Sequence, residues 1–257
     1  MLGIAGRLVF KSVLMTDFTY AAELKKIFRC YGHFYRLHVK GAEPQLCRSV
    51  LKITSLPREA VGAASDPDDL FGSSGSTLNL PDAVVIMMNP GSSRPIEEGV
   101  TDSLLTMPLP AGFKKPLVLT QPDNTQYQIM RIMVSKRWNH VRVLNISDLR
   151  DPKSPSFIAR TQKLAALPGG ETHSMFCEAR TAERETMLRR KSGAPFILGW
   201  GQDAGLIPLA KQCLSRIDGG KIIAVPAGND PVLTAHPSPM LQKKKEEWLD
   251  AILATAS

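Results

Sequence analysis

Four short apolar runs recur along the chain, and a proline, glycine or asparagine stands at the end of each. They cover residues 83–88, 140–145, 195–201 and 221–225. Their length and their content of β-branched residues are typical of buried strands. Segments with the spacing of amphipathic helices lie between and after them, at residues 126–136, 155–167, 178–191, 204–216 and 242–255. This alternation predicts an α/β fold, a three-layer α/β/α sandwich around a central, mostly parallel four-stranded sheet.

The N-terminal third of the chain shows a different pattern. Apolar residues at helical spacing predict a helix over residues 17–31, and alternating residues predict an edge strand over 32–39. Residues 57–80 are rich in Gly, Ser, Asp and Pro, which predicts a loop. We therefore expect an N-terminal extension over residues 1–80, packed on an α/β domain over residues 81–257.

Prolines interrupt the segment that follows the first apolar run. Four of them fall between residues 95 and 119 and exclude a long helix there. A connection of this length predicts a mobile flap beside the strand ends.

The chain of 257 residues carries a formal net charge of +8, which favours an anionic partner. Nucleic acid is the commonest such partner for a compact basic domain, although a basic chain can also simply stay soluble. Positive charge gathers at Arg131, Lys136, Arg137 and Arg142, which suits either a phosphate-tracking surface or a solvated helix face.

The cysteines and the N-terminus bear on the compartment and the chemistry. Four cysteines lack CxxC spacing, which argues against a zinc ribbon or a dense disulfide framework and fits a reducing cytoplasm. An iron–sulfur cluster would need all four to converge in space. The apolar N-terminus is broken by Arg7 and Lys11, so we predict neither a signal peptide nor a membrane span. We expect no cofactor and no bound metal.

Polar residues stand where the predicted strands end. Asn89 follows the first run in the sequence Asn-Pro-Gly-Ser-Ser, and Asn145 ends the second run. The third run ends in Gly-Trp-Gly around Trp200, and the loop after the fourth carries His-Pro-Ser-Pro from His236. Ligands of open α/β sheets bind at the carboxyl ends of the strands. These residues therefore predict one site, although each asparagine taken alone could simply cap a loop.

The motifs, in this order, resemble those of the uracil-DNA glycosylase superfamily. Asn89-Pro90-Gly91 is similar to the water-activating motif of its mismatch-specific, thymine-DNA glycosylase branch. The strand that ends at Trp200 is similar to the superfamily's strand ending in Trp-Gly, and the motif from His236 is similar to the start of its leucine loop. The Val-Leu-Asn that ends at Asn145 is similar to the strand whose asparagine reads the base edge. An uncharacterised bacterial family has similar first and second motifs.

The resemblance implies a DNA glycosylase that hydrolyses the N-glycosidic bond of a flipped-out base. Asn89 would orient the attacking water, and His236 would donate a hydrogen bond to the base carbonyl as negative charge develops there. Asn145 would read the Watson–Crick edge of the base. Because an asparagine is no general base, we expect a slow enzyme or bases that leave easily. The other expected contacts are Ser92, Trp200 and Ser238 with the substrate (core packing being the alternative for Trp200) and Arg94 and Lys243 with the DNA.

Gly91 departs from the uracil-specific members, which carry a bulky aromatic residue just after the Asp-Pro of the first motif. A glycine there should admit a 5-substituted pyrimidine, such as hydroxymethylated or glucosylated cytosine of phage DNA, which suits a role in antiviral defence. The resemblance also allows a uracil or mismatch repair glycosylase. A non-catalytic nucleic-acid-binding protein, favoured by the missing Asp of the first motif, and an enzyme on free nucleotides are further alternatives. We expect DNA as the partner and a cytoplasmic monomer.

Overall fold

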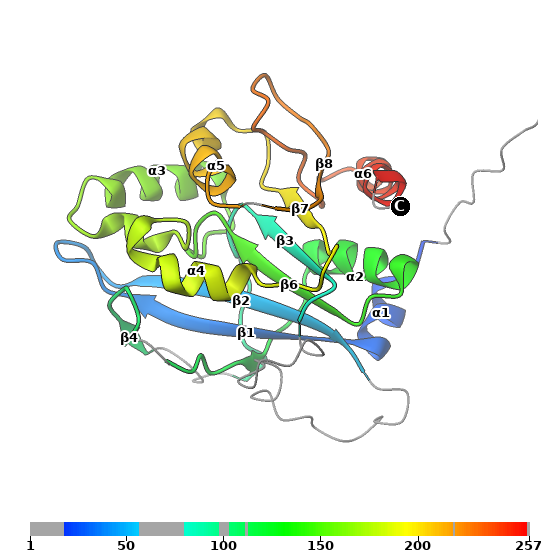
Figure 1. Cartoon of the computed structure of the whole chain (residues 1–257), viewed down its shortest axis with the longest axis horizontal. Helices are drawn as coiled ribbons and strands as arrows, with labels where there is room; N and C mark the ends of the chain where they lie inside the picture. Colours follow the sequence, from blue (N-terminus) through cyan, green and yellow to red (C-terminus); the bar gives the residue numbers. More distant parts are fainter. Residues whose placement is uncertain (1–17, 57–79, 98–102, 111–112, 218, 256–257) are drawn as a thin grey trace, which may run out of the picture.

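The computed structural model of the protein describes residues 18–56, 80–97, 103–110, 113–217 and 219–255. It is an α/β fold built on one mixed sheet with helices around it (Figure 1). The described residues contribute eight strands to this sheet: β1 (Phe28–Leu37), β2 (Gln45–Ser55), β3 (Ala83–Met87), β4 (Leu104–Leu105), β5 (Val118–Leu119), β6 (His140–Asn145), β7 (Phe196–Gly199) and β8 (Ile222–Ala224). Their order is β4-β1-β2-β6-β3-β7-β8, and β5 pairs with β1.

The four predicted strands form the parallel part of this sheet. Strand β3 lies between β6 and β7, and β8 pairs with β7, all in parallel. Every residue of β3 is buried, because alternate side chains enter the cores on the two faces of the sheet. The predicted parallel core and its position between helices are therefore confirmed.

The described sheet has more strands than the four that the sequence predicted. Strands β1 and β2 pair with each other, and β2 pairs with β6, both in antiparallel fashion, so the N-terminal residues continue the same sheet. The hydrophobic pattern concealed β2 because three polar residues within it, Arg48, Ser49 and Lys52, are buried. The predicted helix over residues 17–31 also ends early, since the residues from Phe28 onward pair with β2 instead.

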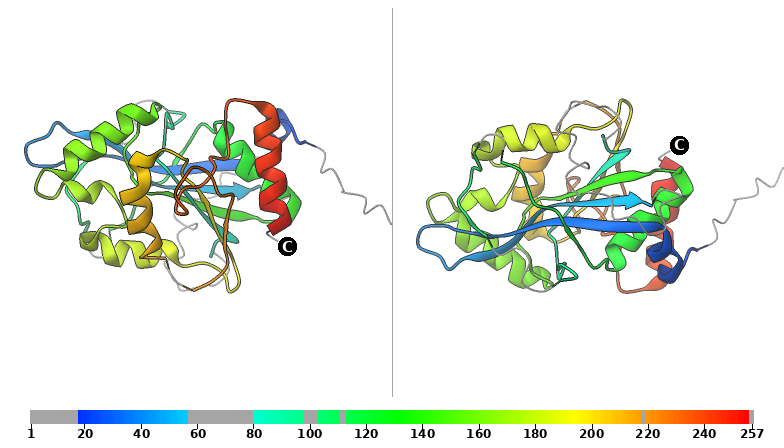
Figure 2. Two further views of the ribbon diagram at one scale, coloured as in Figure 1. Left: turned by 90° about the horizontal axis from the view of Figure 1, so that it is seen from above. Right: turned by 90° about the horizontal axis from the view of Figure 1, so that it is seen from below.

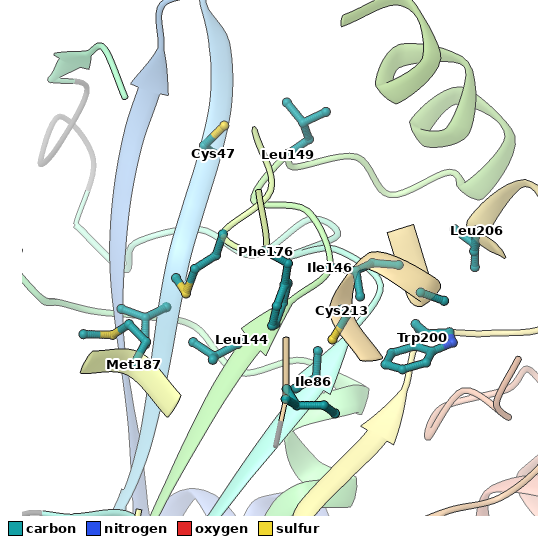
Figure 3. Packing of buried hydrophobic residues seen from close by; sticks show 14 of the residues in the cluster. Cys47, Ile86, Leu144, Ile146, Leu149, Phe176, Met187, Trp200, Leu206 and Cys213 are labelled. Atoms are coloured by element: carbon teal, nitrogen blue, oxygen red, sulfur yellow. The ribbon is translucent and has the colours of Figure 1, made fainter. Parts of the chain in front are cut away.

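Helices cover both faces of the sheet, as the views from above and below show (Figure 2). The helices are α1 (Ala21–Ile27), α2 (Asn124–Lys136), α3 (Ser154–Ala165), α4 (Thr181–Leu188), α5 (Ile207–Leu214) and α6 (Gln242–Thr255), with short 3₁₀ turns at Gly170–His173, Glu178–Arg180 and Ala204–Leu206. Helices α3, α4 and α5 pack on one face and α1, α2 and α6 on the other. Figure 3 shows the core on the α3–α5 face, which includes Phe176 and Trp200.

The proline-rich segment lies away from the predicted position. Strands β4 and β5 belong to it and both pair with β1, while Met107 and Leu117 are buried in the core. Its described residues are thus held at the β1 side of the sheet. No helix in the described part of the chain combines the length and apolar character that a transmembrane span requires.

Candidate functional site

The site lies at the carboxyl ends of the parallel strands, where the chain changes direction. Met87, at the end of β3, is in register with Asn145 of β6 and with Gly199 of β7. The helix after β3 (α2) and the helix after β6 (α3) pack on opposite faces of the sheet. Such a switch point leaves a crevice between neighbouring strand ends, and it is where open α/β sheets bind ligands.

A cavity of about 630 Å³ occupies this position. Seven of the predicted site residues line it: Asn89, Gly91, Ser92, Asn145, Trp200, His236 and Ser238. The first residues of α2 complete one wall of the cavity. Its volume falls in the range of small-molecule sites, so one base or nucleoside fits inside.

Asn145 is buried at this cavity with only 1 % of its surface exposed. Among the described residues, neither its Nδ2 nor its Oδ1 has a hydrogen-bond partner. An unpaired buried amide costs free energy, and native structures rarely leave one without a partner. Because Asn145 lines the cavity, its donor and its acceptor are candidates to bind whatever occupies it.

The Asn89 side chain is held in one orientation by the loop after β6. Its Nδ2 donates a hydrogen bond of 2.7 Å to the backbone carbonyl of Asp151. The amide oxygen is then the polar atom of Asn89 that can accept a hydrogen bond from a ligand or a water in the cavity.

His236 is positioned by its own loop and by the strand beneath it. The backbone N–H of Ser238 donates to Nδ1 of His236 at 3.1 Å, which places the proton of the neutral ring on Nε2. A Cβ atom at Gly199 would lie 2.9 Å from Pro237, so only glycine lets this loop approach so closely. Burial lowers the pKa of His236, against smaller opposing effects of Ser238 and Asp123. The neutral imidazole therefore predominates at neutral pH, with Nε2–H as a donor.

Trp200 is a wall of the cavity and part of the core, as the alternative for this residue anticipated. It is fully buried in the core (Figure 3). Its indole Nε1 donates to the carbonyl of Val232 at 2.9 Å. The backbone N–H of Trp200 also donates to Thr234, which anchors the segment leading to His236. Trp200 therefore shapes the cavity from within the core.

The structure does not bring Arg94 and Lys243 to the cavity. Arg94 is exposed and lines two smaller neighbouring hollows of about 480 and 210 Å³. The smaller of these shares Ser92 and Asp123 with the main cavity. Lys243 is exposed in the first turn of α6.

The basic residues of α2 and β6 are used inside the fold. Arg131 donates to the carbonyl of Thr19, and Arg142 donates to the carbonyl of Met187. Both arginines are buried. Neither predicted alternative, a phosphate-tracking surface or a solvated helix face, holds for these two, because each guanidinium satisfies carbonyl groups within the fold.

Sequence patterns missed three residues at the site. Arg48, from β2, lines the cavity although it precedes the region of motif resemblance. Asp123 lines it too, while its carboxylate caps α2 by accepting from the N–H groups of Thr125 and Gln126. Gln128 is buried beneath the cavity loop and donates to the carbonyl of Pro237 at 3.1 Å. The capping signal at Asp123 was visible in the sequence; the other two residues carried none.

Three carboxylates line the cavity, those of Asp123, Asp151 and Asp203. Asp151 accepts hydrogen bonds from the Lys153 backbone, Ser156 and Arg160, which lower the pKa of its carboxyl although burial opposes this. Asp203 is exposed and caps a 3₁₀ turn. Asp123 is the one carboxylate of the three that acts electrostatically on both Arg48 and His236. It is therefore the best-placed candidate for a proton acceptor.

No protein-family model, curated protein or solved structure matches the chain significantly. Within the described ranges, no three His, Cys, Asp or Glu side chains gather as a metal ion would require. The four cysteines, all described, are buried thiols and form no such group. A function for this cavity has to be inferred from its own residues.

Proposed function

We propose that the protein is a DNA glycosylase that hydrolyses the N-glycosidic bond of a flipped-out base and leaves an abasic site. The observation that supports this most directly is the buried amide of Asn145, a residue that lines the cavity and whose donor and acceptor find no hydrogen-bond partner among the described residues. A donor beside an acceptor matches the Watson–Crick edge of a pyrimidine. Asn89 and His236 line the same cavity as Asn145. In the proposal Asn89 binds the attacking water and His236 binds the leaving base.

In the proposed reaction, water attacks C1′ of the sugar while the bond from C1′ to the base nitrogen breaks. The bonding electron pair leaves with the base, which becomes an anion. The Oδ1 of Asn89 orients the water, since its Nδ2 is occupied by the carbonyl of Asp151. Nε2–H of His236 donates to the base carbonyl, where the negative charge collects. A neutral donor fixed in advance stabilises such charge at little cost in reorganisation.

The proton of the attacking water also needs an acceptor. Asn89 cannot serve, because an amide is not a general base at neutral pH. In this proposal the proton passes to Asp123, the carboxylate that acts electrostatically on His236 and Arg48. With Asp123 as both the cap of α2 and the general base, the proposed site has a proton acceptor that Asn89 alone did not provide.

The substrate of the proposed enzyme is a 5-substituted pyrimidine. Gly91 lines the cavity, and apart from its two chain neighbours no described residue has an atom within 4 Å of the position where its Cβ would stand. That space suits a substituent such as the hydroxymethyl or glucosyl group of modified phage cytosine, and a role in antiviral defence follows. DNA is the proposed partner of a cytoplasmic monomer, with uracil or mismatch repair as the second function of the same site.

An abasic-site assay on defined oligonucleotides tests the proposal. The wild type should release base from DNA that carries 5-hydroxymethylcytosine or its glucosylated form, seen as strand breaks after alkali. Asn89→Ala and His236→Ala should each lose about 100-fold or more in rate, as expected for losing one transition-state contact. Asp123→Asn should lose rate as well, although asparagine caps a helix as well as aspartate does.

The matched control is Asp203→Asn, which removes an exposed carboxylate at the rim of the cavity. It should release base at the wild-type rate. DNA binding without strand breaks in the wild type would point to the non-catalytic binding protein instead. Release from free nucleosides but not from DNA would identify a nucleoside hydrolase and refute the proposal.

A further inference from the structure

Arg48 is a buried cation at the cavity for which the described residues provide no ion pair. It lies on β2 with 1 % of its surface exposed and lines the cavity together with Asn145. Its Nη1 donates to Oγ of Ser93 at 2.7 Å, and its Nε has no hydrogen-bond partner in the described part of the chain. Among the described residues, no carboxylate lies within ion-pair distance of its guanidinium.

Arg180 is also fully buried, and carboxylates compensate its charge. Arg180 forms ion pairs with Asp148 and Glu183, each at 2.7 Å. Burying a charge without such partners is unfavourable, because nothing then offsets the loss of the hydration of the ion. A site that keeps an unpaired cation at a cavity is prepared for an anion from outside the fold.

The surroundings of Arg48 leave its charge in place at neutral pH. Burial lowers the pKa of Arg48 to about 10, which is still far above neutrality. Asp123 and Asp148 favour the charged form from a distance, and Arg150 opposes it. The guanidinium therefore remains a cation.

Within the described ranges, no second positive group at this cavity competes for an anion. Arg48 is the only arginine or lysine among the described residues that line it. The N–H groups of Thr125 and Gln126 at the start of α2 are already bonded to Asp123. Asn145 offers a neutral amide, and His236 a neutral imidazole. An anionic group in the cavity is thus attracted to Arg48.

We propose that Arg48 makes this cavity an oxyanion site, and that its ligand is a pyrimidine that bears a carboxylate or a phosphate. The guanidinium binds either group through paired N–H donors. The pyrimidine part of this inference rests on the proposed function; the oxyanion part rests on Arg48 alone. The charged group belongs either to the base, as a 5-substituent, or to the sugar, as a 5′-phosphate.

Calorimetric titration of the intact chain with two pairs of ligands tests this inference. The first pair is uracil-5-carboxylate against thymine, and the second is thymidine 5′-monophosphate against thymidine. In at least one pair the charged ligand should bind about tenfold or more tightly than the uncharged one, which corresponds to about 1.4 kcal/mol. A preference in the first pair places the charge on the base, and one in the second pair places it on the sugar.

Two variants separate charge from positioning. Arg48→Gln should abolish the preference for the charged ligand. Ser93→Ala should keep it, because that change removes the hydrogen bond to the Asn89 loop and leaves the cation in place. If Arg48→Gln does not fold, Arg48→Lys retains a charge without the paired donors and should keep a smaller preference.

Equal binding of charged and uncharged ligands by the wild type would overturn the inference, and so would a preference that survives in Arg48→Gln. The inference would also be overturned if Ser93→Ala lost the preference as fully as Arg48→Gln. Arg48 would then be a positioning residue that does not bind the anion. The titration measures binding without base release. A failed abasic-site assay therefore leaves the oxyanion site standing, and a failed titration leaves the glycosylase standing.

Discussion

Gly91 has a backbone φ of +60°, in the left-handed region that side chains other than glycine seldom adopt. The turn after β3 needs this conformation, so the glycine has a structural cause that is independent of any substrate. The same residue also leaves the cavity open, because apart from its two chain neighbours no described residue has an atom within 4 Å of its missing Cβ. Both the left-handed backbone conformation and the space for a substrate therefore favour glycine at this position. Only a comparison of substitutions can distinguish the two effects.

Comparison of Gly91→Phe with Gly91→Ala makes that separation. Both variants share a backbone strain of about 1–2 kcal/mol, but only phenylalanine fills the space. We expect Gly91→Phe to lower the rate on 5-hydroxymethylcytosine relative to unsubstituted cytosine or uracil by about tenfold or more. Gly91→Ala should keep the wild-type ratio, and an equal shift in both variants would contradict a steric role. Base release from paired oligonucleotides gives the ratio.

At the scale of elements, the cavity depends on contacts of helix α2 with the C-terminal part of the chain, more than 100 residues later in the sequence. Gln128 of α2 donates to the carbonyl of Pro237 in the cavity loop and to the carbonyl of Lys245 in α6. The side-chain Oε1 of Gln128 accepts from Nη1 of Arg131 at 2.6 Å. One buried amide therefore fixes the loop that carries His236 between two helices.

Replacement of Gln128 by leucine should destabilise the protein strongly. The change removes the buried donor to the carbonyl of Pro237 and the buried acceptor of Arg131, and we expect the free energy of unfolding to fall by about 2–4 kcal/mol. Urea denaturation gives this value, and the matched control is Gln162→Leu on the exposed face of α3. The control should stay within about 0.5 kcal/mol of the wild type. A loss below about 1 kcal/mol in Gln128→Leu would show that the loop holds its place by other contacts.

On the scale of the whole molecule, buried histidines make the free energy of unfolding depend on pH. Burial lowers the pKa of His33 to about 3 and that of His173 to about 4, compared with the ordinary 6.5. Between these values the unfolded chain binds protons that the folded chain refuses. The stability contributed by the neutral rings is therefore present above about pH 6.5 and is lost as the pH falls towards 4.

We expect the free energy of unfolding to drop by roughly 1–2 kcal/mol for each of these histidines between pH 7 and pH 5. Urea midpoints measured at the two pH values report this change. His173→Gln should lessen the dependence on pH, whereas His38→Gln, at an exposed position, should leave it unchanged. A midpoint that does not move between pH 7 and pH 5 would contradict the prediction.

The periodicity of the sequence determined the parallel core and the helices that cover it. A run such as Ala83–Met87 is apolar at every position because both of its faces are buried, and this information is local. Turn residues likewise placed Asn89, Asn145 and His236 at strand ends, and the parallel topology then brought these three to one cavity. Local patterns suffice where the cause of a structure lies within a few residues.

Tertiary structure alone decided which charged and polar groups join that cavity. Strand β2 brings in Arg48 from more than thirty residues before the first motif, as its pairing with β6 dictates. Asp123 caps helix α2, and it also lines the cavity because the first turn of α2 lies there. Basic residues such as Arg142 donate hydrogen bonds to backbone carbonyls inside the fold. Such roles depend on contacts between residues distant in sequence, and no local pattern records them.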